Sequence, residues 1–228
     1  MTMLAIETST DIASAAALEG DALVASLAFR ARRDVCRRLI PEIQAMLAGA
    51  GVSEESLSAV AVGRGPGSFT GIRIGVAMAK GLALALGIPV FGISTLAACA
   101  YPAQGAGGIA CSLIPAHGDE LYSGIFRAAE ALELVEESIL AAGDLMARLS
   151  ELGEPVTFVT VGAQVRRLLP LNQLRVAHRF APPELASHLA CWVGRLAQAR
   201  QQAGEAGDGI GLAPVYLRPS PAEVQASE

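Results

Sequence analysis

The fold of this 228-residue chain is decided by one run, Gly63-Arg64-Gly65-Pro66-Gly67-Ser68-Phe69-Thr70-Gly71-Ile72-Arg73-Ile74-Gly75. It follows an apolar stretch, Leu57 to Val62, that is typical of a strand, and it opens an apolar stretch that predicts a helix over about 70–86. Glycine permits left-handed backbone angles and close backbone approach, and the free N–H groups of a helix N-terminus attract anions. The run is therefore either a phosphate or nucleotide loop, or a rigid turn that lets the helix pack close to its strand.

The spacing of the glycines excludes two common nucleotide motifs. No Gly-Lys-Ser/Thr follows them, so the run is not a P-loop, and Ser68 stands where the dinucleotide fingerprint has its third glycine. If the run does bind phosphate, hydroxyls and glycines near the end of the first strand and in the loop are the candidate contacts. These candidates are Thr8, Ser9, Thr10, Gly65, Gly67 and Ser68.

Composition narrows the class of protein. Hydrophobic residues make up 52% and charged residues 17%, which supports a substantial core. The net charge of −5 disfavours autonomous, non-specific binding to nucleic acid, because such binding needs Lys and Arg to neutralise phosphates. The four cysteines show no C-x-x-C spacing, which favours a reducing, cytoplasmic compartment. The N-terminus lacks the pattern of a signal peptide, and Lys80, Gly81, Gly87 and Pro89 interrupt the most apolar stretch, so we expect no membrane span.

The first half of the chain predicts three strands, a helix, a strand, the glycine loop, a long helix, a strand and a further helix. The expected ranges are 3–8, 13–18 and 23–30 for the first strands, 34–48 for the helix, then 57–62, 70–86, 89–92 and 94 onward.

After the linker at 104–108 the same order recurs. The second half predicts strands at 109–114, 120–126, 133–138, 156–161 and 174–177, and helices at 142–152, 163–169 and 183–203. Both halves spell β-β-β-α-β-α-β-α. We therefore expect an α/β protein of two tandem actin-like (ribonuclease H-like) domains, residues 1–104 and 105–228, as in the superfamily of actin, the heat-shock chaperones and the sugar kinases.

The long helix carries small residues at every fourth position, a stripe that lets another element come close. Apolar residues cover most of the remaining circumference, which is typical of a helix buried on most sides. The helix is either interior to a two-domain chain or part of a subunit interface together with the helix at 34–48. The residues expected at such an interface are Leu39, Ile40, Ile43, Leu47, Ile72, Arg73, Gly75, Val76, Ala79 and Lys80.

The chain resembles the TsaB (YeaZ) family, whose members are degenerate relatives within that superfamily. The full run from Gly63 to Gly75 carries the resemblance most specifically. Three further segments support it: Leu4-Ala5-Ile6-Glu7-Thr8-Ser9-Thr10, Ile93-Ser94-Thr95-Leu96 and Pro214-Val215-Tyr216-Leu217-Arg218. Element order and length agree over essentially the whole chain.

The resemblance implies a role in forming N6-threonylcarbamoyladenosine on tRNA, at the adenosine that follows the anticodon. It implies a non-catalytic subunit that pairs through its N-terminal helices with a TsaD-like transferase, with a TsaE-like ATPase as a further partner and tRNA reached only through the complex. A third alternative is a homodimer through the same helices when the chain is alone, which the heterodimer replaces when the partner is present. No cofactor is expected for the chain itself, apart from weak ATP or ADP binding in the complex.

Two segments depart from the family pattern. Val35-Cys36 stands where members commonly have His-Ser or His-Thr, and Pro115-Ala116-His117 stands where they commonly have Asp-Ala-Arg. An actin-like ATPase needs carboxylates near phosphate hairpins in both domains. Glu7 and Asp11 flank the first hairpin, but Pro115 removes an N–H from the second. An autonomous actin-like ATPase or phosphotransferase is therefore the alternative function, and the less favoured one.

Other chemistry finds little support. His117, His178 and His188 have no partner histidine at helical spacing, so we expect no metal site and no catalytic residue. The single basic cluster, Arg30, Arg32, Arg33, Arg37 and Arg38, is either a solvated helix entry or a patch for phosphate or an acidic partner.

Overall fold

The computed structural model describes residues 1–30, 34–128 and 132–218. They form two compact units, which are described separately. The first consists of Met1–Ala98 together with Ser187–Val215, and the second of Cys99–Ala186 together with residues 216–218.

The first unit is built on a five-stranded mixed sheet in the order β3-β2-β1-β4-β5. The pairs β1–β2 and β2–β3 are antiparallel, whereas β1–β4 and β4–β5 are parallel. The strands are β1 Thr2–Glu7, β2 Ile12–Glu19, β3 Ala22–Arg30, β4 Leu57–Gly63 and β5 Val90–Ile93.

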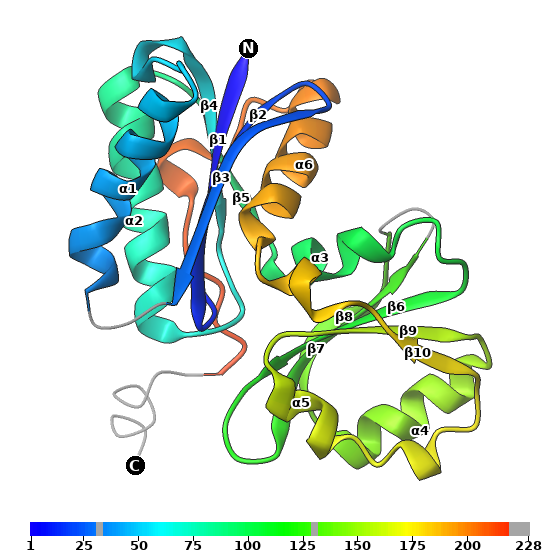
Figure 1. The fold of residues 1–228 in the computed structure, drawn as a ribbon. Coiled ribbons are helices and arrows are strands. Elements are labelled where there is room, and N and C mark those ends of the chain that lie inside the picture. Colours follow the sequence, from blue (N-terminus) through cyan, green and yellow to red (C-terminus); the bar gives the residue numbers. More distant parts are fainter. Residues whose placement is uncertain (31–33, 129–131, 219–228) are drawn as a thin grey trace. The chain divides into compact units, whose positions relative to one another are not determined.

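Helices cover both faces of this sheet (Figure 1). α1 (Val35–Gly49) and α2 (Phe69–Leu86) lie on one face, and α6 (Leu189–Gln202) lies on the other. Successive side chains along a strand point to opposite faces of the sheet, so the sheet has a separate hydrophobic core on each face. Leu4 and Ile6 face α1 and α2, whereas Met3 and Ala5 face α6. Because both faces are covered, β1 is buried along its whole length.

The second unit repeats this topology in the order β8-β7-β6-β9-β10. Its strands are β6 Ile109–Pro115, β7 Glu120–Arg127, β8 Leu132–Ala141, β9 Val156–Thr160 and β10 His178–Phe180. α4 (Ala142–Leu152) and α5 (Ala163–Leu168) pack on one face through a core that includes Leu145, Leu149 and Phe158. The short helix α3 (Thr95–Ala100) begins in the first unit and ends in the second.

Short 3-10 turns link several of these elements. They lie at Glu54–Ser56, Tyr101–Ala103, Leu171–Gln173, Pro183–Ala186 and Gly209–Gly211. The expected α/β fold with two units of equal strand order is confirmed.

Two elements differ from expectation. The strand predicted at 174–177 is wrong: Leu174 and Val176 pack against the core outside any strand, and the ladder begins at His178, which pairs with Val156. Apolarity there marks burial rather than sheet pairing. The helix predicted at 183–203 is interrupted: Pro183–Ala186 forms a 3-10 turn, and α6 begins only at Leu189.

The boundary predicted at residue 104 also differs from the structure, because 187–215 belong to the first unit. Ala190, Val193 and Ala197 of α6 fill the core on the second face of the first sheet. Gly194 explains the close fit, since a Cβ there would overlap Leu18 and crowd Ala5. α6 therefore belongs to the first unit, although the second unit lies between them in the sequence.

Candidate functional site

The glycine loop joins β4 to α2 and lies on the turn between β1 and β2. The N–H of Ser68 donates to the Ser9 carbonyl at 2.7 Å, and a Cβ at Gly67 would overlap that same carbonyl. Gly65 has φ +106°, and a Cβ there would come within 2.6 Å of the Val215 carbonyl. Gly65 also accepts a hydrogen bond from the N–H of Thr95. The glycines are therefore required by close backbone approach within the chain itself.

The small-residue stripe of α2 faces the sheet. The hydroxyl of Thr8 donates to the Gly71 carbonyl at 2.7 Å. A Cβ at Gly75 would lie well inside 3.0 Å of the Thr8 Oγ1 and at 3.4 Å from Val62. The stripe therefore lets α2 sit close to β1 and β4. This is the rigid-turn interpretation of the run.

Glu7 is a fully buried carboxylate at the end of β1, with 0% of its surface exposed. Its Oε1 accepts from the N–H of Ser9 at 2.5 Å, and its Oε2 accepts from the hydroxyl of Thr95 at 3.1 Å. The hydroxyls of Ser9 and Thr95 lie 3.0 Å apart. A Cβ at Gly63 would overlap the Glu7 carboxylate. Because residue 63 is glycine, there is space for the Glu7 side chain. Burial raises the pKa of Glu7, and the hydrogen bonds from Ser9 and Thr95 oppose this shift only in part.

Of the six predicted phosphate contacts, Ser9, Gly67 and Ser68 meet directly, through the hydrogen bond and the close backbone approach given above. Thr8, Ser9 and Thr10 are buried, and the Thr10 hydroxyl donates to the Ile12 carbonyl. Ser68 is exposed and caps α2, its Oγ accepting from the N–H of Gly71. The polar groups of this cluster are thus largely engaged with one another, and phosphate binding there stays a prediction.

Most of the predicted interface residues lie inside the first unit, which corrects their assignment. Seven of them contribute to its core or its close helix packing: Leu39, Ile43, Leu47, Ile72, Gly75, Val76 and Ala79. On α1, Leu39, Ile43 and Leu47 form the buried face of the helix. On α2, apolar residues cover most of the circumference, so two stripes fit a sheet-facing position equally well.

The other three predicted residues are more accessible. Ile40 is half-buried and lines a small groove between α1 and α2. Arg73 is exposed, with its guanidinium 3.8 Å from the centre of the Phe69 ring. Lys80 is held within the unit, since its Nζ donates to the carbonyls of Ile210 and Leu212 at 3.0 and 3.1 Å.

The exposed face of α2 is a different stripe, of which the predicted interface included only Arg73. Its members recur at helical spacing on the side away from the sheet, and we call them the outer stripe. The outer stripe consists of Thr70, Arg73, Ala77, Gly81, Leu84 and Ala85. One charge among six residues makes it predominantly small and apolar. The signal available in the sequence was a second small-residue pattern, offset from the glycine stripe.

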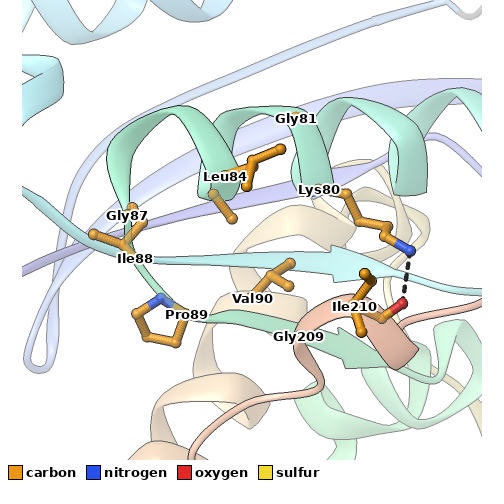
Figure 2. Close-up of a pocket in the computed structure, with 10 residues that line it drawn as sticks. Lys80, Gly81, Leu84, Gly87, Ile88, Pro89, Val90, Gly209 and Ile210 are labelled. Atoms are coloured by element: carbon orange, nitrogen blue, oxygen red, sulfur yellow. Dashed lines mark hydrogen bonds between the residues drawn. The ribbon is translucent and has the colours of Figure 1, made fainter.

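An apolar pocket of about 430 Å³ lies at the C-terminal end of α2 (Figure 2). Leu84, Ile88, Pro89 and Ile210 contribute to its lining. Leu84 and Ile210 are 85% and 95% exposed, unusual values for large hydrophobic side chains. The outer stripe and this pocket share Gly81 and Leu84, so they form one continuous apolar surface.

α2 is also, within the described part of the chain, the one helix long and apolar enough to cross a membrane by length and composition alone. Its mean hydropathy is 1.5, and 28% of the window is buried. Its glycine stripe packs on β1 and β4, and β5 follows it in the same sheet.

The basic cluster is only partly described. Arg30 and Arg37 are exposed, and Arg38 bonds Glu42 at 3.2 Å and stacks over Phe29. Arg32 and Arg33 lie outside the described residues, as does the tail from 219 onward.

The second-unit hairpin is a tight turn. The N–H of Ala116 donates to the Glu120 carbonyl, and the Glu120 side chain binds Arg218 at 2.6 Å. No three His, Cys, Asp or Glu residues gather to hold a metal ion among residues 1–30, 34–128 and 132–218.

Comparison with known proteins gives a consistent result. The family model for TsaD, tRNA N6-adenosine threonylcarbamoyltransferase, matches residues 29–203. A Bacillus subtilis protein named tRNA threonylcarbamoyladenosine biosynthesis protein TsaB is 28% identical over 99% of this chain and 97% of its own length. The Escherichia coli protein of the same name is 44% identical over 96 residues, which span 42% of this chain and 41% of that protein.

Solved structures agree. YeaZ from Pseudomonas aeruginosa superposes with a TM-score of 0.79 at 29% identity, over 95% of this chain and 99% of that one. A ROK hexokinase from Thermus thermophilus has a TM-score of 0.53 at 14% identity over 87% of this chain and 100% of that one, and shares the fold. The chain therefore belongs to the family that the TsaD model describes, on the branch whose curated members are named TsaB and whose solved structures are called YeaZ.

Proposed function

We propose that this chain is a non-catalytic scaffold subunit of the complex that forms N6-threonylcarbamoyladenosine on tRNA next to the anticodon. In this proposal it pairs with a TsaD-like threonylcarbamoyl transferase and supports its activity. The names of its TsaB relatives support the pathway. The outer stripe of α2 is the observation that carries the pairing.

The outer stripe needs a partner for a physical reason. α2 already fills the core of the first unit with its glycine stripe, so its remaining apolar side faces solvent. Ala77 and Gly81 let another helix approach closely, and Leu84 offers a large apolar side chain at the rim of the pocket. Contiguous exposed apolar surface of this kind is typical of protein–protein contacts.

The hairpin that holds nucleotide phosphates in ATPases of this fold supports a non-catalytic role. Both carboxylate oxygens of Glu7 are engaged by Ser9 and Thr95 inside the protein, away from solvent. The glycine loop packs on the same turn, where the N–H of Ser68 donates a hydrogen bond to the Ser9 carbonyl. A metal ion or an attacking water would have to displace these contacts.

The proposal includes further partners that the relatives suggest. A TsaE-like ATPase would join the complex, tRNA would be reached through it, and weak ATP or ADP binding would occur only there. The cytoplasm is the compartment in which such a complex would act on tRNA.

Light scattering after size-exclusion chromatography tests the pairing, with this chain mixed with the TsaD-like protein of its own organism. We expect a heterodimer with the wild type. Ala77→Glu places a charge at the centre of the outer stripe and should weaken the heterodimer by about a hundredfold or more. Gln202→Glu, which is exposed on α6, adds the same charge elsewhere and should leave the heterodimer intact.

Two results would overturn the proposal. One is the absence of any heterodimer with the wild type, and the other is unchanged binding by Ala77→Glu. A separate assay of ATP turnover by the chain alone addresses the alternative. Robust, metal-dependent turnover would favour an autonomous actin-like ATPase or phosphotransferase.

A further inference from the structure

Four arginines and a histidine lie in one stretch of the second unit that contains no acidic residue. No Asp or Glu stands between Glu154 and Glu184. We call these five side chains the basic group, and its members are Arg166, Arg167, Arg175, His178 and Arg179. Without the four arginines, 13 of the 17 basic residues remain against 22 acidic ones, a net charge of −9 for the rest of the chain. Such an uneven distribution of charge is typical of proteins that contact a polyanion.

The structure brings the basic group to one edge of the second sheet. α5 carries its first two members, and β10, the edge strand, carries its last two. The guanidinium of Arg166 lies 4.6 Å from the centre of the Phe180 ring and so joins α5 to β10. The N–H of Arg175 donates to the Ser150 hydroxyl at 3.1 Å, which holds the segment before β10 against α4. Members that are spread over 14 positions of the sequence thus gather near β10.

Two members of the basic group are anchored and keep unused donors. Arg166 Nη2 donates to the Ala181 carbonyl at 2.9 Å. Arg179 donates through Nε to the Thr157 hydroxyl at 3.0 Å and through Nη2 to the Ala106 carbonyl at 2.9 Å. A guanidinium has five N–H donors, so each of these arginines can bind a further acceptor. Because the contacts already fix the guanidinium, little conformational entropy is lost when it binds an anion.

The other members of the basic group face solvent. Arg167, Arg175 and His178 are exposed. None of the four arginines forms an ion pair with another residue that the structure describes, whereas Arg127 of the same unit pairs with Glu154. Positive charge that the unit does not neutralise attracts an anionic partner.

The outer side of β10 adds uncharged donors. The Ala177 carbonyl and the Ala181 N–H, which flank the strand, both bond to β9. Hydrogen bonding to one neighbour alternates along a strand, so the N–H groups of His178 and Phe180 point away from β9. Within the described part of the chain, neither N–H donates to another segment. Backbone donors and guanidinium groups therefore lie at the same edge.

We propose that the basic group and the outer edge of β10 bind the phosphate backbone of RNA. Phosphate oxygens accept hydrogen bonds from arginine side chains and from backbone N–H groups, and such contacts position a nucleic acid without reading its sequence. The choice of RNA over an acidic protein rests on the proposed function, because the relatives are named for a pathway that modifies tRNA.

The chain alone should bind RNA weakly. The net charge of −9 outside the basic group repels phosphates, so the basic group adds to an affinity that the other proteins of the complex complete. A chain with a net charge of −5 can therefore contact tRNA through its second unit.

Salt dependence gives a specific test of this surface. Fluorescence anisotropy of a labelled, unmodified tRNA transcript measures its affinity for the complex of this chain with the TsaD-like protein. Each arginine that contacts a phosphate contributes about 0.7–0.9 to the slope of log K against log salt concentration. Arg167→Gln and Arg175→Gln should each reduce the slope by about that amount. The double variant should weaken binding about tenfold or more.

Two control variants separate a phosphate contact from a general effect of charge. Arg167→Lys combined with Arg175→Lys keeps both positive charges, so its slope should match that of the wild type. Gln202→Glu changes the net charge as much as one Arg→Gln substitution, but it lies on α6 of the first unit. It should also leave the slope unchanged.

Light scattering on each variant shows whether the complex is intact, which keeps this proposal distinct from the proposed function. An unchanged affinity and slope in the double Gln variant, within an intact complex, would overturn the proposal. If that variant instead lost only its binding to the TsaE-like protein, the surface would take an acidic protein and the proposal would fail as well. If no complex forms, the proposed function fails, and the same titration is made with the chain alone at low salt. A double Gln variant that then binds the transcript like the wild type would overturn the present proposal.

Discussion

The two glycines Gly75 and Gly81 lie in the same helix and predict opposite responses to alanine. A Cβ at Gly75 would overlap the Thr8 hydroxyl and touch Val62, whereas a Cβ at Gly81 would meet no atom within 4 Å. Gly75→Ala is therefore expected to destabilise the first unit, and Gly81→Ala to stabilise it.

The magnitude follows from two opposing terms. Replacing glycine by alanine in a helix interior gains about 0.5–1 kcal/mol, and this is the full effect expected at Gly81. At Gly75 the overlap forces α2 away from β1, at a cost of about 1–3 kcal/mol. It also disturbs the bond from the Thr8 hydroxyl to the Gly71 carbonyl, which contributes about 0.5–1.5 kcal/mol. The net expectation for Gly75→Ala is a loss of about 0.5–4 kcal/mol.

The assay is urea denaturation followed by the fluorescence of Trp192. It is the only tryptophan of the chain and lies on α6 of the first unit, so its signal reports the unfolding of that unit. Stability is compared at constant slope against denaturant. Thr8→Ala provides an internal check, because removing the hydroxyl relieves the overlap. The double variant should lose less than the sum of the two single losses.

If Gly75→Ala were as stable as Gly81→Ala, the glycine stripe would not face the sheet, and the assignment of the outer stripe would fail with it.

Three further predictions concern the hydrogen bonds of the buried Glu7 and the contact between Asp208 and β5. Burial raises the pKa of Glu7, so the folded state holds its proton more tightly than the unfolded state. The contribution of Glu7 to the free energy of unfolding is fully present below the ordinary pKa of 4.5 and is lost as the pH rises through the pKa of the folded state. In urea titrations, the free energy of unfolding of the wild type minus that of Glu7→Gln should therefore fall with rising pH. Gly63→Ala, whose Cβ would overlap the Glu7 carboxylate, should cost about 2–4 kcal/mol or prevent folding, as monitored by circular dichroism. Asp208→Asn should weaken the hydrogen bond that the N–H of Gly92 in β5 donates to the Asp208 side chain. We expect a loss of about 1–3 kcal/mol in stability, seen as faster hydrogen exchange at Gly92.

Much of the fold could be predicted because its signals are local. The β-β-β-α-β-α-β-α order is predicted from the spacing of hydrophobic residues and from the turn residues between the elements, which are properties of short sequence windows. The helix at Phe69–Leu86 and the strand at Leu57–Gly63 fall within a residue of their predicted ends. What failed depends on distant contacts. No local pattern shows that α6 returns to the first sheet, where Gly194 meets Leu18.

The candidate site shows the same limit. An apolar helix with two small-residue patterns does not reveal which of them faces the sheet, and the choice is made by Thr8, 67 residues before Gly75. Glu7 is predicted only to flank the first hairpin, because its burial depends on Gly63 and Thr95, which are distant in the sequence. The run from Gly63 to Gly75 was nevertheless informative, since its glycines mark close approach within the chain.

In the proposed complex, this chain supports a TsaD-like transferase through the outer stripe of α2 and does no chemistry itself. The most direct measurement is the formation of N6-threonylcarbamoyladenosine on tRNA by the partner proteins of the same organism, quantified by mass spectrometry of nucleosides. We expect the modified nucleoside to form with the wild type and with Gln202→Glu. With folded Ala77→Glu, we expect its formation to fall about a hundredfold and to recover in part when the variant is added in excess. Equal formation with Ala77→Glu, or without the chain at all, would contradict it.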